Sequence, residues 1–208
     1  MTQQAAMKQQ SAKTKRGVRF LALSLAILLI SSILIWGFQT DWGRVEIRRL
    51  QLVGEDGTKI STLLYLPENA TSDNPAPCAV TYHGRSNQGH SNDTWSMELA
   101  RRGYVVLSPD LTGGGESAVM GGGTDANLRA NQAAFVARYA LTLDVVDPEQ
   151  LNLIGCSLGT QTTTLVAAMM PEDINSCLNV MGPFMVRRNM DTIYSLLTEH
   201  DITVGFIK

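Results

Sequence analysis

Hydrophobic positions follow two different patterns on either side of residue 40. Residues 20–38 form an apolar run of 19 residues without a charge. Beyond this run, apolar stretches of four or five residues alternate with longer segments of helical periodicity, and turns rich in glycine, proline, asparagine and aspartate separate them. The pattern therefore predicts one long apolar helix, followed by a domain in which strands and helices alternate.

The second part opens with two strand-like segments, 44–53 and 59–66, around the turn 54–57, which together predict a β-hairpin. Later apolar runs predict further strands at 78–82, 104–107, 151–154, 177–181 and 202–207. Helical periodicity predicts helices at 93–102, 125–143, 160–170 and 190–199, and Asp93 is expected to cap the first of them. Because strands that are apolar throughout are buried on both faces, we expect an α/β fold with a mostly parallel sheet, helices on both of its faces and the hairpin at one edge.

The run at residues 20–38 has the length of a membrane span. At about 1.5 Å per residue, such a helix nearly matches a hydrocarbon core of about 30 Å. A buried core helix and a cleavable signal peptide are the alternatives. However, a core helix seldom has serine as its only polar residue, and the end of the run lacks the small residues of a cleavage site. We therefore predict a basic cytoplasmic tail at 1–19, a transmembrane helix in the lipid bilayer at 20–38 and a folded domain at 44–208.

The distribution of charge predicts the orientation of this span. Five basic residues and no acidic residue precede position 20, whereas three arginines follow the span closely. The positive-inside rule therefore predicts a single-pass protein with its N-terminus in the cytoplasm and its domain on the outer side. Trp36 and Trp42 are expected near the outer interface. With 17 basic and 19 acidic residues the net charge is only −2, which argues against nucleic acid as the main partner.

Two short motifs suggest chemistry at the ends of strands. Residues 155–159 read G-x-S-x-G between a predicted strand and a predicted helix, a pattern that presents the serine on a strained turn. Ser157 is therefore the candidate nucleophile, and Gly155 and Gly159 allow the strand and the helix to approach each other. His83 and Gly84 end an earlier strand. In the functional interpretation the amides of Arg85 and Leu158 form an oxyanion hole; in the alternative, His83 and Gly84 only finish the strand.

Together these features resemble the α/β-hydrolase family over about residues 45–185. The hairpin, the His83–Gly84 dipeptide, the segment 110–117 and the G-x-S-x-G motif appear in the family's order. Segment 110–117 is similar to the family's D-x-R-G-x-G-x-S loop, with Thr112 where arginine is usual. The resemblance implies that Ser157 attacks an ester, thioester or amide carbonyl of a small-molecule or peptide substrate and forms an acyl-enzyme that water releases. It implies no metal and no organic cofactor.

The resemblance also places the acid and the histidine of a catalytic triad after the serine in the chain. Only 51 residues follow Ser157, so we expect this chain to be the amino-terminal part of a hydrolase that ends before the acid and the histidine. Asp191, Glu199 and His200 lie in this region, but they are more typical of solvated surface groups. Two hypotheses follow: a membrane-anchored serine hydrolase, esterase-like or peptidase-like, and a catalytically inactive α/β-hydrolase-like binding domain.

Overall fold

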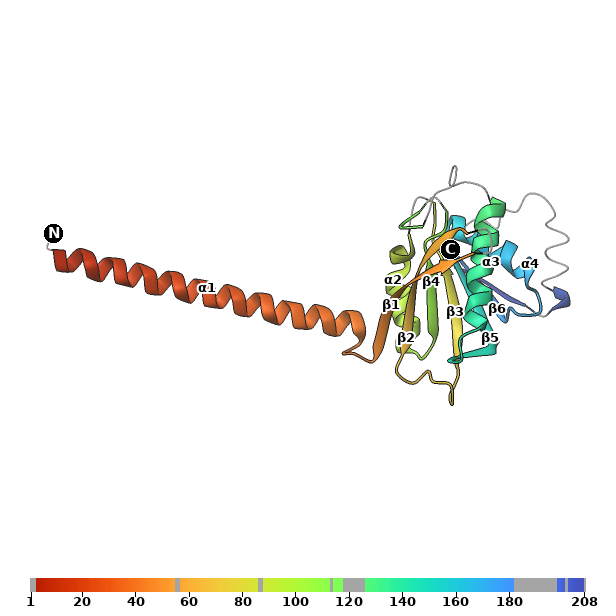
Figure 1. Ribbon diagram of the computed structural model, residues 1–208, viewed down its shortest axis with the longest axis horizontal. Helices are drawn as coiled ribbons and strands as arrows, with labels where there is room; N and C mark the ends of the chain where they lie inside the picture. The colour runs from red at the N-terminus through yellow and green to blue at the C-terminus, as the bar shows by residue number, and fades with distance from the viewer. Residues whose placement is uncertain are drawn as a thin grey trace. The chain divides into compact units, whose positions relative to one another are not determined.

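The computed structural model describes residues 3–54, 57–85, 88–112, 114–117, 126–181, 198–200 and 202–207, with side chains from residue 14 to residue 205. The chain divides into two compact units, Met1–Gly43 and Arg44–Lys208. The second unit contains the sheet and the candidate site (Figure 1).

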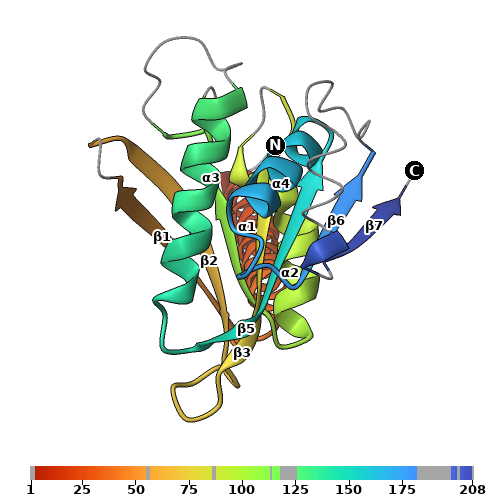
Figure 2. The same ribbon diagram turned by 90° about the vertical axis from the view of Figure 1, so that its right-hand side faces the viewer.

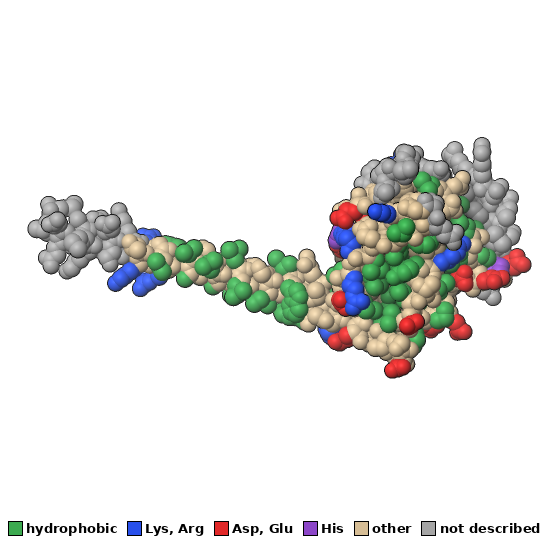
Figure 3. Space-filling model, viewed as in Figure 1, with side chains coloured by type: hydrophobic (Ala, Val, Ile, Leu, Met, Phe, Trp, Pro, Cys, Tyr) green, Lys and Arg blue, Asp and Glu red, His purple; other side chains and the backbone are tan. Residues whose placement is uncertain are grey.

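The first unit is dominated by helix α1 (Gln3–Thr40). Between Phe20 and Phe38 every residue except Gly37 is exposed, and hydrophobic side chains run along the helix while Lys and Arg gather nearer its N-terminal end (Figure 3). Thr14–Thr40 has a mean hydropathy of 2.5 in its most apolar stretch, so the helix is long and apolar enough to cross a membrane. A signal sequence near an N-terminus meets the same criterion.

The described residues of the second unit form one seven-stranded sheet in the order β1-β2-β4-β3-β5-β6-β7. The strands are β1 (Val45–Val53), β2 (Lys59–Pro67), β3 (Ala76–Tyr82), β4 (Val105–Pro109), β5 (Val146–Cys156), β6 (Ser176–Val180) and β7 (Thr203–Ile207). β1 pairs antiparallel with β2, and β2 antiparallel with β4, while all other neighbours are parallel. The predicted hairpin and the mostly parallel sheet are therefore confirmed.

Helices cover both faces of this sheet (Figure 2). On one face lies α2 (Asp93–Arg101), and on the other lie α3 (Ala126–Leu141) and α4 (Leu158–Met169). Alternate residues of β3 belong to separate cores, because Cys78 and Val80 pack on the side of α3 and α4 and Ala79 packs with Met97 of α2. This two-sided burial explains why the strand reads as a continuous apolar run, and it confirms the α/β fold.

Three sequence predictions differ from the structure or fall outside it. Helix α2 begins at Asp93, so Asn92, and not Asp93 as predicted, occupies the N-cap position. The Asp93 carboxylate instead accepts hydrogen bonds from the Tyr65 hydroxyl, at 2.6 Å, and from the His90 ring, at 2.8 Å. Strand β5 begins at Val146, five residues before the apolar run, because parallel pairing with β3 extends back to Ala76. The helix predicted at 190–199 lies almost wholly outside the described residues.

The connections that leave the carboxyl ends of β3 and β5 run to opposite faces of the sheet. These two strands are parallel neighbours, with Tyr82 opposite Gly155. The connection after β3 passes through α2 on one face, whereas the connection after β5 passes through α4 on the other (Figure 2). In open α/β sheets, ligands bind at such a switch point. The His83–Gly84 dipeptide follows β3 directly, and the G-x-S-x-G motif spans the end of β5 and the start of α4.

Candidate active site

Ser157 forms the turn between β5 and α4. Its backbone has φ 53° and ψ −113°, a conformation that is strained for any residue with a side chain, and the residue is exposed. Its N–H donates to the Val180 carbonyl of β6 at 2.9 Å, which ties the turn to the sheet. Leu158 begins α4, so its N–H belongs to the first turn, where helix amides have no partner within the helix. The turn thus presents a hydroxyl beside a helix N-terminus.

Two glycines allow this turn to exist. A Cβ on Gly155 would lie 2.3 Å from the Gly159 carbonyl oxygen, and a Cβ on Gly159 would lie 2.1 Å from the Tyr82 carbonyl oxygen and 3.1 Å from that of His83. All of these atoms belong to the backbone, so no side-chain movement makes room. The close approach brings the start of α4 against the segment after β3, which holds the candidate oxyanion donor.

The imidazole of His83 organises that segment. The ring is buried, and its Nδ1 lies 2.7 Å from the Gly84 carbonyl oxygen. Its Nε2 accepts from the Leu111 N–H at 3.0 Å, which assigns the proton to Nδ1. In a planar trans peptide the N–H points opposite to the C=O, so fixing the Gly84 carbonyl also fixes the direction of the Arg85 N–H. His83 thus orients the amide of Arg85, a residue whose own side chain is exposed.

The residues that the sequence singled out are therefore partly brought together. The contact of Gly159 with Tyr82 and His83 places Ser157 and Leu158 beside the segment 83–85. Among the described residues, neither a histidine nor a carboxylate is hydrogen-bonded to the Ser157 hydroxyl. Glu199 is exposed, His200 is half-buried, and Asp191 lies outside the described residues.

Asp110 organises the loop after β4, which lies next to the segment 83–85. Its carboxylate accepts from the Gly89 N–H at 2.6 Å and from the Glu116 N–H at 2.9 Å, while its carbonyl accepts from the Ser117 hydroxyl. Gly115 has φ +57°, and a Cβ there would lie 2.1 Å from the Asp110 carboxyl carbon. The segment that resembles the family's loop therefore folds around its aspartate. The sequence identified the segment 110–117 by its similarity to the family's loop but did not show these partners of Asp110.

Two buried polar residues of α3 were missed altogether. Gln132 accepts from the Thr112 N–H at 2.8 Å through Oε1, and the guanidinium of Arg129 donates to the carbonyls of Thr112 and His83 at 3.1 and 3.3 Å. They stand three residues apart and therefore share one helix face. Two long polar side chains on the inner face of a helix were the signal in the sequence, since such groups are buried only when they have partners.

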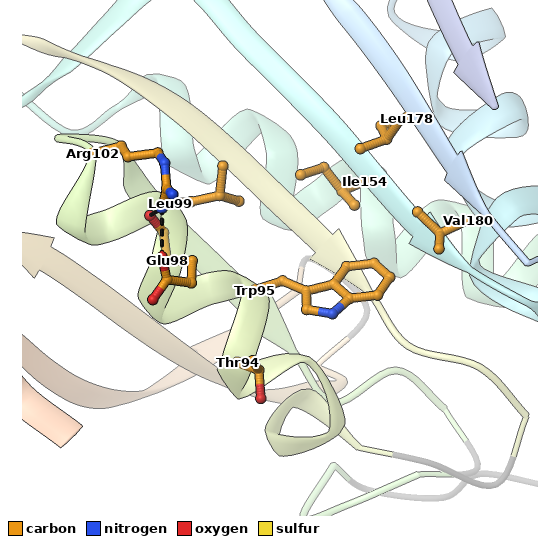
Figure 4. Close-up of a pocket in the computed structure, with 8 residues that line it drawn as sticks. All are labelled: Thr94, Trp95, Glu98, Leu99, Arg102, Ile154, Leu178 and Val180. Carbon is orange, nitrogen blue, oxygen red and sulfur yellow. Dashed lines mark hydrogen bonds and ion pairs between the residues drawn. The ribbon is translucent and has the colours of Figure 1, made fainter. Parts of the chain in front are cut away.

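Neither of two notable pockets is centred on Ser157. A groove of about 410 Å³ lies between α2 and strands β5 and β6, where Trp95 and Leu99 face Ile154, Leu178 and Val180 (Figure 4). A second pocket, of about 320 Å³, lies between the β1–β2 hairpin and α3. Within the described ranges, no three His, Cys, Asp or Glu side chains lie close enough together to hold a metal ion.

The buried histidine predicts a pH dependence of stability. Burial lowers the pKa of His83 from its usual 6.5 to about 4. Between pH 6.5 and 4 the unfolded chain therefore binds a proton that the folded chain resists, and acidification over this window should reduce the free energy of unfolding by about 3 kcal/mol. Urea unfolding at several pH values measures this loss. We expect His83→Gln to remove most of it and His90→Gln, at an exposed position, to retain it; equal losses in the two variants would contradict the assignment.

Comparison with known proteins places this geometry in a family. The sequence matches the family described as alpha/beta hydrolase fold over residues 80–197. No curated protein gives a significant match to the sequence. Solved structures that resemble the chain include the α/β hydrolase GrgF from Penicillium sp. sh18, with a TM-score of 0.58 and 16% identity over 74% of this chain and 53% of that one.

Two further solved structures show the same fold. The thioesterase domain from the curacin biosynthetic pathway has a TM-score of 0.53 and 21% identity, over 76% of this chain and 54% of its own. Acetyl xylan esterase 1 from Thermoanaerobacterium sp. JW/SL YS485 has a TM-score of 0.58 and 18% identity, over 76% and 56%. The chain thus spans about half the length of these structures. With the family match covering more than half of the sequence, the chain belongs to the α/β-hydrolase family.

Proposed function

We propose that this protein is a membrane-anchored serine hydrolase in which Ser157 is the nucleophile. The observation that carries the proposal is the backbone of Ser157, which holds an exposed hydroxyl in a strained conformation at the switch point of the sheet. Strain of this kind costs about 1–3 kcal/mol, and it typically persists where function requires the geometry. The esterase and thioesterase among the structures of the same fold support an ester or thioester substrate.

In the proposed reaction the Ser157 oxygen attacks the acyl carbon and loses its proton to a base. The amides of Arg85 and Leu158 stabilise the negative charge that develops on the carbonyl oxygen. The bond to the leaving group then breaks, the leaving group takes up the proton, and an acyl-enzyme remains. Water attacks this ester, releases the acid and restores the hydroxyl. Among the described residues, no histidine or carboxylate is hydrogen-bonded to the Ser157 hydroxyl as such a base would be.

A fluorophosphonate probe tests the proposed nucleophile. The serine oxygen attacks the phosphorus and fluoride leaves, so the adduct stays on the reacting residue. The full-length protein, meaning the natural protein that contains this sequence, should carry one adduct in detergent, and peptide mass spectrometry should locate it at Ser157. A Ser72→Ala variant, changed at an exposed turn residue, should be labelled as the wild type is. Absence of an adduct at Ser157 would instead support an inactive binding domain, the alternative favoured by the lack of a described base near its hydroxyl.

The proposed anchor is the segment 20–38 of α1. It is apolar, and every residue in it except Gly37 is exposed. Trp36 and Trp42, which are 52% and 54% exposed, lie near its end, where side chains of an interfacial belt are expected. We propose that residues 1–19 lie in the cytoplasm and that residues 44–208 form a domain on the outer side. Protease added to intact cells should then digest the domain; its protection until the cells are lysed would reverse this orientation.

A further inference from the structure

Arg129 is a buried cation between the two loops that border the candidate site. Arg129 is 2% exposed. Its guanidinium donates to the Thr112 carbonyl of the loop after β4 and to the His83 carbonyl after β3. Its Nε is buried, and none of the described residues forms a hydrogen bond with it. Among the described residues no carboxylate forms an ion pair with it. Burial, followed by the nearby charge of Arg85, lowers the pKa of Arg129.

This arrangement is costly if its purpose is stability alone. Removing a charged group from water costs several kcal/mol, and apolar residues of similar size often stabilise a fold as well or better. A long apolar side chain, however, donates no hydrogen bond to a carbonyl. What Arg129 supplies is a single planar group whose nitrogens hold two backbone carbonyls from different loops.

One of these carbonyls, that of His83, lies two residues before Arg85, whose N–H is the proposed oxyanion donor. The His83 carbonyl oxygen is held by Arg129 and lies beside Gly159 at the start of α4. The next carbonyl, that of Gly84, is held by the His83 ring. Arg129 of α3 therefore fixes the peptide plane between His83 and Gly84, and the imidazole fixes the next plane, which contains the Arg85 N–H.

Resting on the proposed function, we propose that Arg129 is a positioning residue for the oxyanion hole: by binding the His83 and Thr112 carbonyls it sets the Arg85 amide in its place beside Ser157. The guanidinium does not touch the substrate. Its contribution appears when negative charge develops on the carbonyl oxygen, because a misplaced donor weakens the transition state more than it weakens substrate binding.

Three variants of the full-length protein in detergent test this role: Arg129→Met, Arg129→Lys and, as a control at an exposed position of the same helix, Arg138→Met. Removing one oxyanion donor outright lowers kcat about 10²–10³-fold, so displacing it should lower kcat for p-nitrophenyl acetate by about 10–100-fold in Arg129→Met. KM should stay within about twofold, since the ground state is little affected. Arg129→Lys, which keeps the charge and a donor, should recover part of the loss, and Arg138→Met should match the wild type.

A second measurement does not depend on activity. Amide hydrogen exchange should be faster in the segments 83–85 and 110–112 of Arg129→Met than in the wild type, and unchanged in Arg138→Met. Folded Arg129 variants with wild-type kcat, or with unchanged exchange in both segments, would overturn the positioning role. Failure of the proposed function looks different, because the wild-type protein itself would then form no adduct at Ser157, whatever the exchange of the two segments.

Discussion

The Ser157→Ala variant is expected to hydrolyse p-nitrophenyl acetate about 10⁴-fold more slowly than the wild-type protein, because loss of the proposed nucleophile removes the covalent route and leaves only the proposed oxyanion donors and substrate binding. This corresponds to about 5.5 kcal/mol of transition-state stabilisation. The measurement is the steady-state rate of the full-length protein in detergent. A wild-type rate in Ser157→Ala would show that another residue performs the chemistry.

The Ser157→Gly variant separates the effect of losing the hydroxyl on activity from the effect of backbone strain on stability. Ser157→Ala keeps a Cβ at φ 53° and therefore keeps the strain, whereas Ser157→Gly relieves it. We expect Ser157→Gly to be as inactive as Ser157→Ala and more resistant to urea, by about 1 kcal/mol in the free energy of unfolding. Ser72→Ala, changed far from the strained turn in sequence and exposed, should leave both quantities unchanged. If glycine brought no gain in stability, the turn would not store the strain that the backbone angles indicate.

The order of the strands and helices could be predicted from the sequence because local patterns determine it. The continuous apolar run at 78–82 indicates burial on both faces, and Ser157 between Gly155 and Gly159 indicates a strand-to-helix turn. Each of these features depends on residues within a few positions of one another. The same holds for the hairpin, whose strands β1 and β2 follow each other closely in the chain and pair from Val53 opposite Lys59.

The partners of buried polar groups could not be predicted in the same way. The Asp93 carboxylate is used by Tyr65 and His90 rather than as a helix cap, and Tyr65 lies 28 residues earlier in the chain. Arg129 reaches a carbonyl 46 residues away. Such contacts depend on how the sheet brings distant loops together, and a single sequence shows only that a polar residue occupies a buried face. The motif indicated residues 83–85 as a candidate part of an oxyanion hole, whereas the contact of Arg129 with the His83 carbonyl is visible only in the fold.

The Gly159→Ala variant is expected to be destabilised by about 3 kcal/mol or more, or to fail to fold, because overpacking against rigid backbone has no inexpensive relief. The new Cβ would lie 2.1 Å from the Tyr82 carbonyl oxygen and 2.9 Å from its carbonyl carbon. Relieving the clash requires α4 to move away from β3, and this movement also separates Leu158 from the segment 83–85. Urea unfolding of the purified variant gives the loss of stability directly.

Gly205→Ala is the matched control in the same sheet. Its Cβ would lie 3.1 Å from the end of the flexible Leu178 side chain and 4.0 Å, an ordinary van der Waals distance, from the Cys177 carbonyl oxygen. The free energy of unfolding should therefore change by less than about 1 kcal/mol. If Gly159→Ala folds at all, its activity should fall further than its stability explains, since the oxyanion donors would stand apart even in the folded fraction. A Gly159→Ala protein with wild-type stability would mean that α4 does not pack against the end of β3, and the two amides proposed to act on one oxygen would then have no common position.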